Sequence, residues 1–480
     1  MKVKAGFLPV ACHYFLDNKM LDFENPKSEQ GSLIYEDYKK MLKLLNKYFI
    51  VVEDGIIYSE EKSHKIIDLF KEEKIDLLIT SNILWAEDYL LLDVVKELKH
   101  LPLLNWIFSP YYELKKEIKV QEFLRGCGPC GAYQLNPGLQ RIKENIKYIF
   151  GHPEDEKIIE EIKNYYDVIK TIKELKNKKI AHIPSGWDIQ TDIDLDKFKL
   201  YKKIGPKVVH YVANDLKEVF DRVGDKEAKK LFDYYKSNYE IVDISDPTLK
   251  IATKAAIALA NFADENNIDA ISYNENSADL HRVLKLNPSL YYEGIYSSNR
   301  VIGMEGDLPT ITALMILKHL SNGPVMFTEI LNIDRKNNII LSGHPGNHDL
   351  IGLTDENSNI KIVPDYEWKN AKENIYGLEG AWMHFSAKKG NITICELIYD
   401  NNDFKLIFST GYSTGEKTLE DYSQANIRVP YNIDEFIIRS AESGFGHHFA
   451  FCYGNQKNKL KELSKLLDIK AIDLEENLHI

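Results

Sequence analysis

GMEGDLPTITALMILKHLSNGPVMFTEI, the stretch from Gly303 to Ile330, decides the fold of the chain around it. It opens on a short apolar strand at 301–304, and Glu305 follows directly. Asp307 is placed to cap a helix, and Pro309 falls in the first turn, where a missing N–H costs nothing. Apolar residues three and four apart then indicate a buried helix face. The stretch therefore predicts strand, helix and strand, as in an α/β sheet.

Polar residues that bind metals follow the strands of this region. The helix ends at Asn322-Gly323-Pro324, and a second apolar strand at 325–327 leads to Glu329. A third strand, at 339–342, leads to His344. In open α/β sheets, ligands bind at such strand ends. Two glutamates and one or two histidines that converge from separate elements would form a divalent-metal site with room for proton transfer.

A histidine pair far downstream is a further candidate. His447 and His448 follow Gly444-Phe445-Gly446, and glycines let a backbone approach a ligand closely. A histidine that is simply satisfied in the core at the start of a strand is the alternative interpretation. We expect at least one of the two to act at the site.

Composition excludes several classes of protein. The 480 residues carry 61 basic and 73 acidic side chains, a net charge of −12, which argues against nucleic-acid binding. The N-terminus resembles a buried strand rather than a signal peptide, and no apolar run approaches the ~20 residues that span a bilayer. Five scattered cysteines do not form a disulfide framework. We expect a cytoplasmic protein with no membrane or nucleic-acid partner.

The pattern of elements predicts an α/β protein with three domains. Residues 1–175 alternate short apolar strands with amphipathic helices, which is typical of a parallel sheet with helices on both faces. Residues 176–325 repeat this alternation and carry Glu305. After that point, in 326–480, short strands joined by Asn, Asp and Gly turns indicate a largely antiparallel region. The predicted fold is therefore two Rossmann-like parallel-sheet domains followed by a β-rich C-terminal domain.

Two loops contain residues that could indicate other chemistry. Cys127-Gly128-Pro129-Cys130 matches thioredoxin-type redox sites, but it does not follow an early strand, and no second CxxC completes a zinc site. No apolar strand leads into its GxGxxG pattern, so a dinucleotide site is disfavoured. We expect a tight loop near the substrate, with Cys127 lining it. Trp187, just past the strand at 180–183, lies at a pocket edge or merely covers the sheet end.

The order of these features resembles the L-arabinose isomerase and L-fucose isomerase superfamily over nearly the whole chain. Glu305-Gly306-Asp307 and Phe327-Thr328-Glu329 are similar to the acidic metal ligands of the family. Leu341-Ser342-Gly343-His344 resembles the histidine ligand of arabinose isomerases, and Gly446-His447-His448 resembles the last ligand, His448. Residues 330–333 and 126–131 depart from the family pattern, which leaves the sugar open.

The resemblance implies an intramolecular oxidoreductase that converts an aldose, a pentose or 6-deoxyhexose, into its ketose through an enediolate. Glu305 and Glu329 would be catalytic, and both would bind a divalent cation with His344 and His448. Such ligands suit Mn²⁺, with Co²⁺ or Mg²⁺ as alternatives. The further residues expected near the sugar are His13, Cys127, Trp187 and His447.

The family assembles as trimer-based oligomers with shared active sites, so a homo-oligomer, a hexamer, is expected. A metal-dependent hydrolase and a non-catalytic sugar-binding protein on the same fold are the alternatives. The absence of an HExxH helix weakens the first of these.

Overall fold

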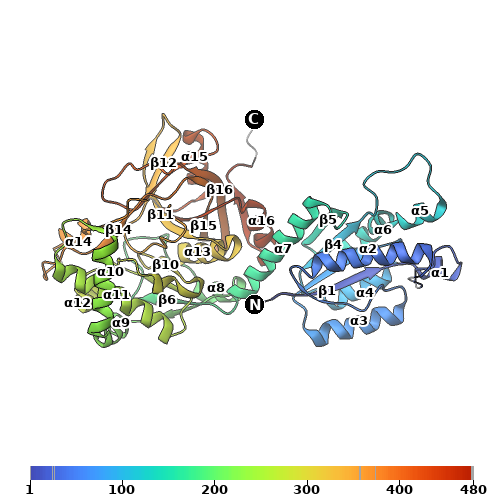
Figure 1. Ribbon diagram of the computed structural model, residues 1–480, viewed down its shortest axis with the longest axis horizontal. Coiled ribbons are helices and arrows are strands. Elements are labelled where there is room, and N and C mark those ends of the chain that lie inside the picture. Colours follow the sequence, from blue (N-terminus) through green and yellow to red (C-terminus); the bar gives the residue numbers. More distant parts are fainter. Residues whose placement is uncertain (1, 24, 26, 356–357, 373, 477–480) are drawn as a thin grey trace. The chain divides into compact units, whose positions relative to one another are not determined.

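A computed structural model describes residues 2–23, 25, 27–355, 358–372 and 374–476. The chain divides into two compact units, Met1–Lys173 and Glu174–Ile480 (Figure 1). The boundary predicted near residue 325 falls inside the second unit, and the division into three domains stays a prediction.

The first unit is built on a five-stranded parallel sheet in the order β2-β1-β3-β4-β5. This is a doubly wound order, in which the strand sequence reverses beside β1. The strands are β1 (Lys4–Val10), β2 (Ile50–Val52), β3 (Leu77–Asn82), β4 (Leu103–Phe108) and β5 (Ile146–Gly151). The helices are α1 (His13–Asp17), α2 (Glu29–Leu45), α3 (Glu60–Glu73), α4 (Tyr89–Glu97), α5 (Val120–Arg125), α6 (Gly128–Ile142) and α7 (Glu156–Leu175).

Alternation along β1 explains why helices cover both faces of this sheet. Leu8 and Val10 point into a core formed with α3, α4 and α6. Phe7 points to the other face and stacks on Tyr38 of α2. Successive strand residues face opposite ways, so a strand buried on both sides is apolar throughout.

The second unit contains a four-stranded parallel sheet in the order β10-β9-β6-β7. Its strands are β6 (Lys179–Ile183), β7 (Lys207–His210), β9 (Ala270–Tyr273) and β10 (Val301–Gly303). The helices of this part are α8 (Lys197–Lys203), α9 (Ala213–Arg222), α10 (Asp225–Asn238), α11 (Asp246–Glu265), α12 (Ala278–Leu284) and the 3₁₀ helix η1 (Glu293–Asn299).

The remainder of the second unit is a mixed, mainly antiparallel sheet in the order β15-β18-β11-β12-β17-β16-β19. Pairing between β15 and β16 closes it into a barrel-like shape. Its strands are β11 (Val325–Asp334), β12 (Ile339–Gly343), β15 (Gly390–Asp400), β16 (Asp403–Ser413), β17 (Gln424–Arg428), β18 (His448–Tyr453) and β19 (Lys470–Asp473). A separate three-stranded sheet consists of β14 (Trp382–His384), β13 (Lys361–Val363) and β8 (Glu240–Ile241), in that order. The other helices of this region are α14 (Tyr366–Lys369), α15 (Ile433–Ser443) and α16 (Lys457–Leu467).

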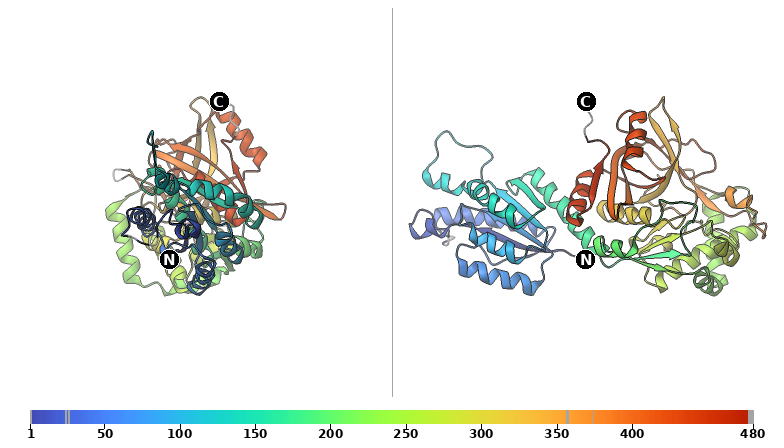
Figure 2. Two further views of the ribbon diagram at one scale, coloured as in Figure 1. Left: turned by 90° about the vertical axis from the view of Figure 1, so that its right-hand side faces the viewer. Right: turned by 180° about the vertical axis from the view of Figure 1, so that it is seen from behind.

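Helix α13 (Leu308–Ser321) joins the two layers of this unit. It packs on β9 and β10 of the parallel sheet and on β11, β15 and β18 of the barrel. Figures 1 and 2 show this unit from opposite sides. Nearly all of its residues are buried, as expected for a helix that is apolar all round. Asp307 caps it by accepting a hydrogen bond from the Thr310 N–H at 2.7 Å, with Pro309 in the first turn. The predicted cap is therefore confirmed.

The predicted fold class is confirmed: parallel α/β sheets are followed by a β-rich, barrel-like region. Among the residues described, no helix is both long and apolar enough to cross a membrane.

Candidate functional site

Glu305 lies just after β10, in a backbone conformation that side chains rarely adopt. Its φ is 58° and that of Gly306 is 71°. A Cβ on Gly306 would lie 2.4 Å from the carbonyl oxygen of Ser185, so glycine is required there. The backbone N–H of Trp187 donates to the Glu305 carbonyl at 3.2 Å. Such strain persists only where the surroundings enforce it, and it gathers at functional sites.

Three histidines surround the carboxylate of Glu305. The Nε2 atom of His344 lies 3.6 Å from its Oε1, and the Nε2 atoms of His447 and His448 each lie 3.6 Å from its Oε2. These side chains come from the ends of β10 and β12 and from the start of β18. The structure therefore brings Glu305, His344, His447 and His448 together.

His448 is oriented as a metal ligand would be. Its Nδ1 contacts Asp307 Oδ2 at 3.0 Å, which leaves Nε2 directed toward Glu305. The His448 side chain is 1% exposed, and no hydrogen bond reaches Nε2 from the described part of the chain. A carboxylate on one ring nitrogen fixes the tautomer that presents a lone pair on the other.

Glu329 lies in register with this histidine. It pairs with His448 of β18 and, on its other side, with Gly343 of β12. Directly opposed residues on neighbouring strands project to the same face of the sheet. Glu329 is half-buried, and its charge contributes to raising the pKa of His344. Its carboxylate is nevertheless outside both of the compact ligand groups formed by the described residues.

Glu275, which the sequence analysis missed, is part of the cluster. It follows β9, and its carboxylate accepts a hydrogen bond from the Glu305 N–H at 2.7 Å. It is 6% exposed, and burial raises its pKa to about 8. The sequence pattern that identified Glu305 is a glutamate that follows an apolar strand. The same pattern occurs at Tyr273-Asn274-Glu275, so Glu275 could have been predicted from the sequence.

The turn that carries His447 is held by two further carboxylates. Asp192 accepts hydrogen bonds from the backbone N–H of His447 at 3.0 Å and from its Nδ1 at 2.7 Å. Both carboxylate oxygens of Glu396, on β15, lie within 2.9 Å of the Gly446 N–H. A Cβ on Gly446 would lie 2.4 Å from Glu396 Oε1, so a larger residue there would displace this carboxylate. These contacts are non-local, and no spacing in the sequence indicates them.

The charges of the cluster are strongly coupled. Burial favours the neutral form of Glu305, but its close contacts with His344 and His447 outweigh burial and hold the pKa of the carboxyl well below its usual range. Burial opposes protonation of His344, but the contact with Glu305 and the charge of Glu275 raise the pKa of His344 to about 9. Burial, with the charge of His344, lowers the pKa of His448. Glu305 is therefore an anion, and His448 offers a neutral imidazole.

These residues fit a divalent cation. The described residues form two groups in which the possible ligand atoms, one from each residue, all lie within 4.8 Å of one another. The first group is Glu305, His447 and His448, and the second is Glu275, Glu305 and His344. The unpartnered, buried Nε2 of His448 is the observation that favours a metal, because burying a lone pair without a partner is costly. Mixed carboxylate and imidazole donors suit Mn²⁺ and its neighbours.

Of the other predicted residues, one lies beside Glu305 and two belong to the first unit. Trp187 is half-buried in the loop against Glu305, next to Gln190, whose Nε2 hydrogen-bonds the Glu305 carboxylate. His13 and Cys127 belong to the first unit. His13 Nδ1 lies 2.9 Å from Glu87 Oε1, and Cys127 precedes α6. Their contact with a sugar stays a prediction.

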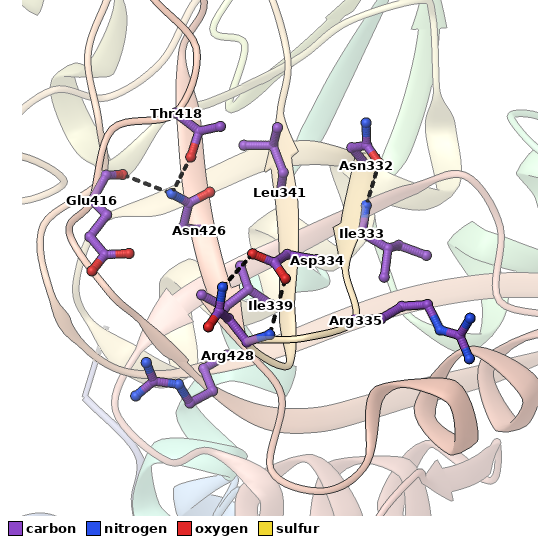
Figure 3. A pocket seen from close by; sticks show the side chains of 11 residues that line it. Asn332, Ile333, Asp334, Arg335, Ile339, Leu341, Glu416, Thr418, Asn426 and Arg428 are labelled. Atoms are coloured by element: carbon purple, nitrogen blue, oxygen red, sulfur yellow. Dashed lines mark hydrogen bonds between the residues drawn. The ribbon is translucent and has the colours of Figure 1, made fainter.

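A cavity of about 700 Å³ on the barrel is a different feature (Figure 3). Its lining includes the C-terminal end of β11 and residues of β12, and none of the clustered carboxylates and histidines is among its lining residues. Several of its polar groups bond one another: Asn426 Nδ2 donates to Thr418 Oγ1 at 2.7 Å, and Asn337 Nδ2 to Asp334 Oδ2 at 2.7 Å.

Known proteins match this chain in the region that carries part of the cluster. A family model described as the L-arabinose isomerase central domain matches residues 191–323, which include Asp192, Glu275, Glu305 and Asp307. These matches confirm the resemblance to the arabinose isomerase family. The sulfoquinovose isomerase of Priestia megaterium is 19% identical over 88% of this chain and 91% of its own.

Arabinose isomerases match over a shorter span. The L-arabinose isomerase of Shouchella clausii is 22% identical over 71% of this chain and 70% of its own length. The L-arabinose isomerase of Bacillus subtilis is 20% identical over 68% of this chain and 66% of its own length. The predicted enzyme class, an aldose–ketose isomerase, is confirmed by these relatives within the arabinose isomerase family. The hydrolase and the non-catalytic binding protein are correspondingly disfavoured.

Proposed function

We propose that this protein is a divalent-metal-dependent isomerase that interconverts an aldose and its ketose by moving a proton between C2 and C1. The observation that carries the proposal is the convergence of Glu305, His344 and His448 from separate strand ends, with the buried Nε2 of His448 left unpartnered. Glu305, His344 and His448 would hold the cation, and Glu329 and His447 lie beside them.

The reaction needs a base, an acid and charge stabilisation. Removing the proton at C2 turns the C–H electron pair into a C1=C2 double bond and places negative charge on O1. The ketose forms when C1 receives a proton, O2 loses its proton to become the C2 carbonyl oxygen, and O1 is protonated to a hydroxyl. When bound, a divalent cation stabilises the negative charge on the sugar oxygens as a Lewis acid. General acid–base catalysis contributes roughly 10²–10⁴-fold.

We assign the proton transfer to Glu329, with Glu305 in support. Glu305 is engaged by three histidines and by Gln190, which stabilise its anion and weaken it as a base. Glu329 faces the same side of the sheet as His448 and lies outside that network. Trp187 and the loop beside it cover one side of Glu305 and would limit the access of water.

We propose a pentose, a 6-deoxyhexose or, from a relative that matches 88% of this chain, sulfoquinovose as the substrate. Mn²⁺ is the proposed metal, with Co²⁺ and Mg²⁺ as alternatives. The cytoplasmic location inferred from the sequence is part of this proposal.

The first experiment measures ketose formation by NMR from L-arabinose, L-fucose and sulfoquinovose, using protein stripped with a chelator and then reloaded with Mn²⁺. We expect metal-dependent conversion of one sugar. Glu305→Gln should reduce it by roughly 10²-fold or more, because the anionic ligand and its histidine contacts are lost. Glu442→Gln, an exposed change on α15, is the matched control.

Three results would contradict the proposal. The first is tight metal binding without conversion of any of these or related sugars. The second is conversion that persists without metal, and the third is full activity of Glu305→Gln. Conversion lost in Glu305→Gln but kept in Glu329→Gln would overturn only the assignment of the proton transfer.

A further inference from the structure

Two cysteines at the start of α6 play no part in the proposed reaction. Cys127 is the N-cap residue of this 15-residue helix, and Cys130 lies one turn further on, with Pro129 between them. Both thiols are free. Cys130 is exposed, whereas Cys127 is half-buried and its Sγ donates to the Phe123 carbonyl at 3.4 Å.

The turn between the cysteines is pressed against the ends of the neighbouring strands. A Cβ on Gly128 would lie 2.5 Å from the Asn82 carbonyl oxygen and 2.8 Å from that of Phe108. A Cβ on Gly131 would lie 2.8 Å from the Asn82 side chain. The helix is thus anchored at β3 and β4, and Cys127 sits at the point where the chain enters it, between Gly126 and Gly128.

We propose that Cys127 and Cys130 are a redox-active dithiol that closes reversibly to a disulfide by exchange with a low-molecular-weight disulfide. The exposed Cys130, as its thiolate, attacks one sulfur of the small disulfide and releases the other as a thiol. Cys127 then attacks the Cys130 sulfur and releases the second small thiol. The chain loses two electrons and two protons, and the small disulfide gains them.

The spacing permits this bond after a small local movement. Side chains three residues apart on a helix have Cβ atoms about 5–6 Å apart. A disulfide needs about 3.8 Å, so the first turn must tighten by about 1–2 Å. Cys127 has a ψ of 1°, outside the helix proper, and it has a glycine on each side. The entry to the helix is therefore the part that can move while Gly131 stays packed.

The surroundings of the two thiols also determine which of them reacts first. Burial raises the pKa of Cys127, so this thiol is less reactive toward a reagent in solution. The exposed Cys130 therefore reacts first with the small disulfide. The other thiols, Cys12, Cys395 and Cys452, are buried and shielded from exchange. Since ligands bind at the carboxyl ends of strands in open α/β sheets, closure would reshape the edge where such a ligand would lie.

The test uses the full-length chain, equilibrated in buffers of graded oxidised-to-reduced glutathione ratio, quenched with N-ethylmaleimide and digested with trypsin. Cleavage after Arg125 and Arg141 releases a peptide that contains only these two cysteines. We expect this peptide to carry no maleimide under oxidising conditions and to weigh two hydrogens less than the reduced peptide. Reduced glutathione should restore two labelled thiols.

Single variants identify each partner. In Cys127→Ser the exchange should stop at a stable glutathione adduct on Cys130, whereas Cys130→Ser should stay largely unmodified at Cys127. Cys395→Ser is the control and should leave the bridge intact. The proposal is overturned if the unaltered chain accumulates a glutathione adduct on Cys130 without a bridge, or if both cysteines remain labelled at every ratio. Neither readout depends on isomerase activity.

Discussion

At the scale of single residues, the site depends on carboxylates that hold histidines in place. Asp307 contacts His448, Asp192 contacts His447, and Glu396 holds the turn before both. Groups of this kind set the orientation and basicity of ligands without touching the metal, and their loss typically costs 10–100-fold in affinity or activity. The geometry of the cluster is therefore expected to be sensitive to residues that never contact the sugar.

Glu396 offers a test of this dependence. In Glu396→Leu the Gly446 N–H loses its acceptor and the turn loosens, so we expect metal affinity to fall by roughly 10-fold or more. Glu396→Gln keeps an acceptor oxygen and should retain most of the affinity. Calorimetric titration with Mn²⁺ measures both. Equal affinities of the leucine variant and the unaltered chain would show that the contact does not position the histidines.

His182 on β6 predicts a pH-dependent stability. Burial, with the charges of His210 and Lys197, lowers its pKa to about 4, below about 6.5 in the unfolded chain. Between these values the unfolded chain binds the proton more strongly, so the free energy of unfolding falls as the pH drops through this window. The loss should approach roughly 3 kcal/mol near pH 4.

Urea unfolding of metal-free protein at pH 7 and pH 5 measures this effect. His182→Leu lacks the titrating group, so its stability should change less between the two pH values. The same loss of stability in both proteins would assign the pH dependence to other groups.

At the scale of secondary structure, α13 connects the site to the core. Its cap residue has two roles, because Asp307 Oδ1 accepts the Thr310 N–H and Oδ2 contacts His448. The helix itself is buried against both sheets, so its start is fixed relative to β10 and β18. One carboxylate thereby links the helix terminus to a proposed metal ligand.

Two substitutions separate these roles. Asp307→Asn keeps a good cap, so the free energy of unfolding without metal should change little. Its Nδ2 would donate to His448 Nδ1 and force the ring proton onto Nε2, so metal affinity should fall by roughly 10–100-fold. Asp307→Ala should lose the affinity and also about 1 kcal/mol of stability. Unchanged metal affinity in Asp307→Asn would refute the role assigned to the carboxylate.

At the scale of the whole molecule, the prediction concerns assembly. The resemblance to the arabinose and fucose isomerases implies a trimer-based oligomer, a hexamer, of this 55.4 kDa chain. Light scattering of the purified protein should report the mass of the hexamer. Isomerase activity should fall when the protein is diluted to concentrations at which the hexamer dissociates. A monomeric mass together with full activity would contradict both the oligomer and a shared active site.

The sequence alone determined the fold class and pointed to several residues of the cluster. Apolar strands followed by Glu305, Glu329 and His344 are local patterns, and strand ends converge in such sheets whatever the details of packing. The helix cap at Asp307 could be predicted equally well, because a cap depends only on the sequence at the start of its own helix.

Only the tertiary structure decided how these groups act together. It gave Glu305 its left-handed backbone, set Glu275 against its N–H, and placed Asp192 and Glu396 on the turn that carries the histidines. It also showed that Glu329 faces His448 from outside the compact ligand groups of the described residues. These relations join residues 30 to 255 positions apart, and no local periodicity or propensity records such contacts.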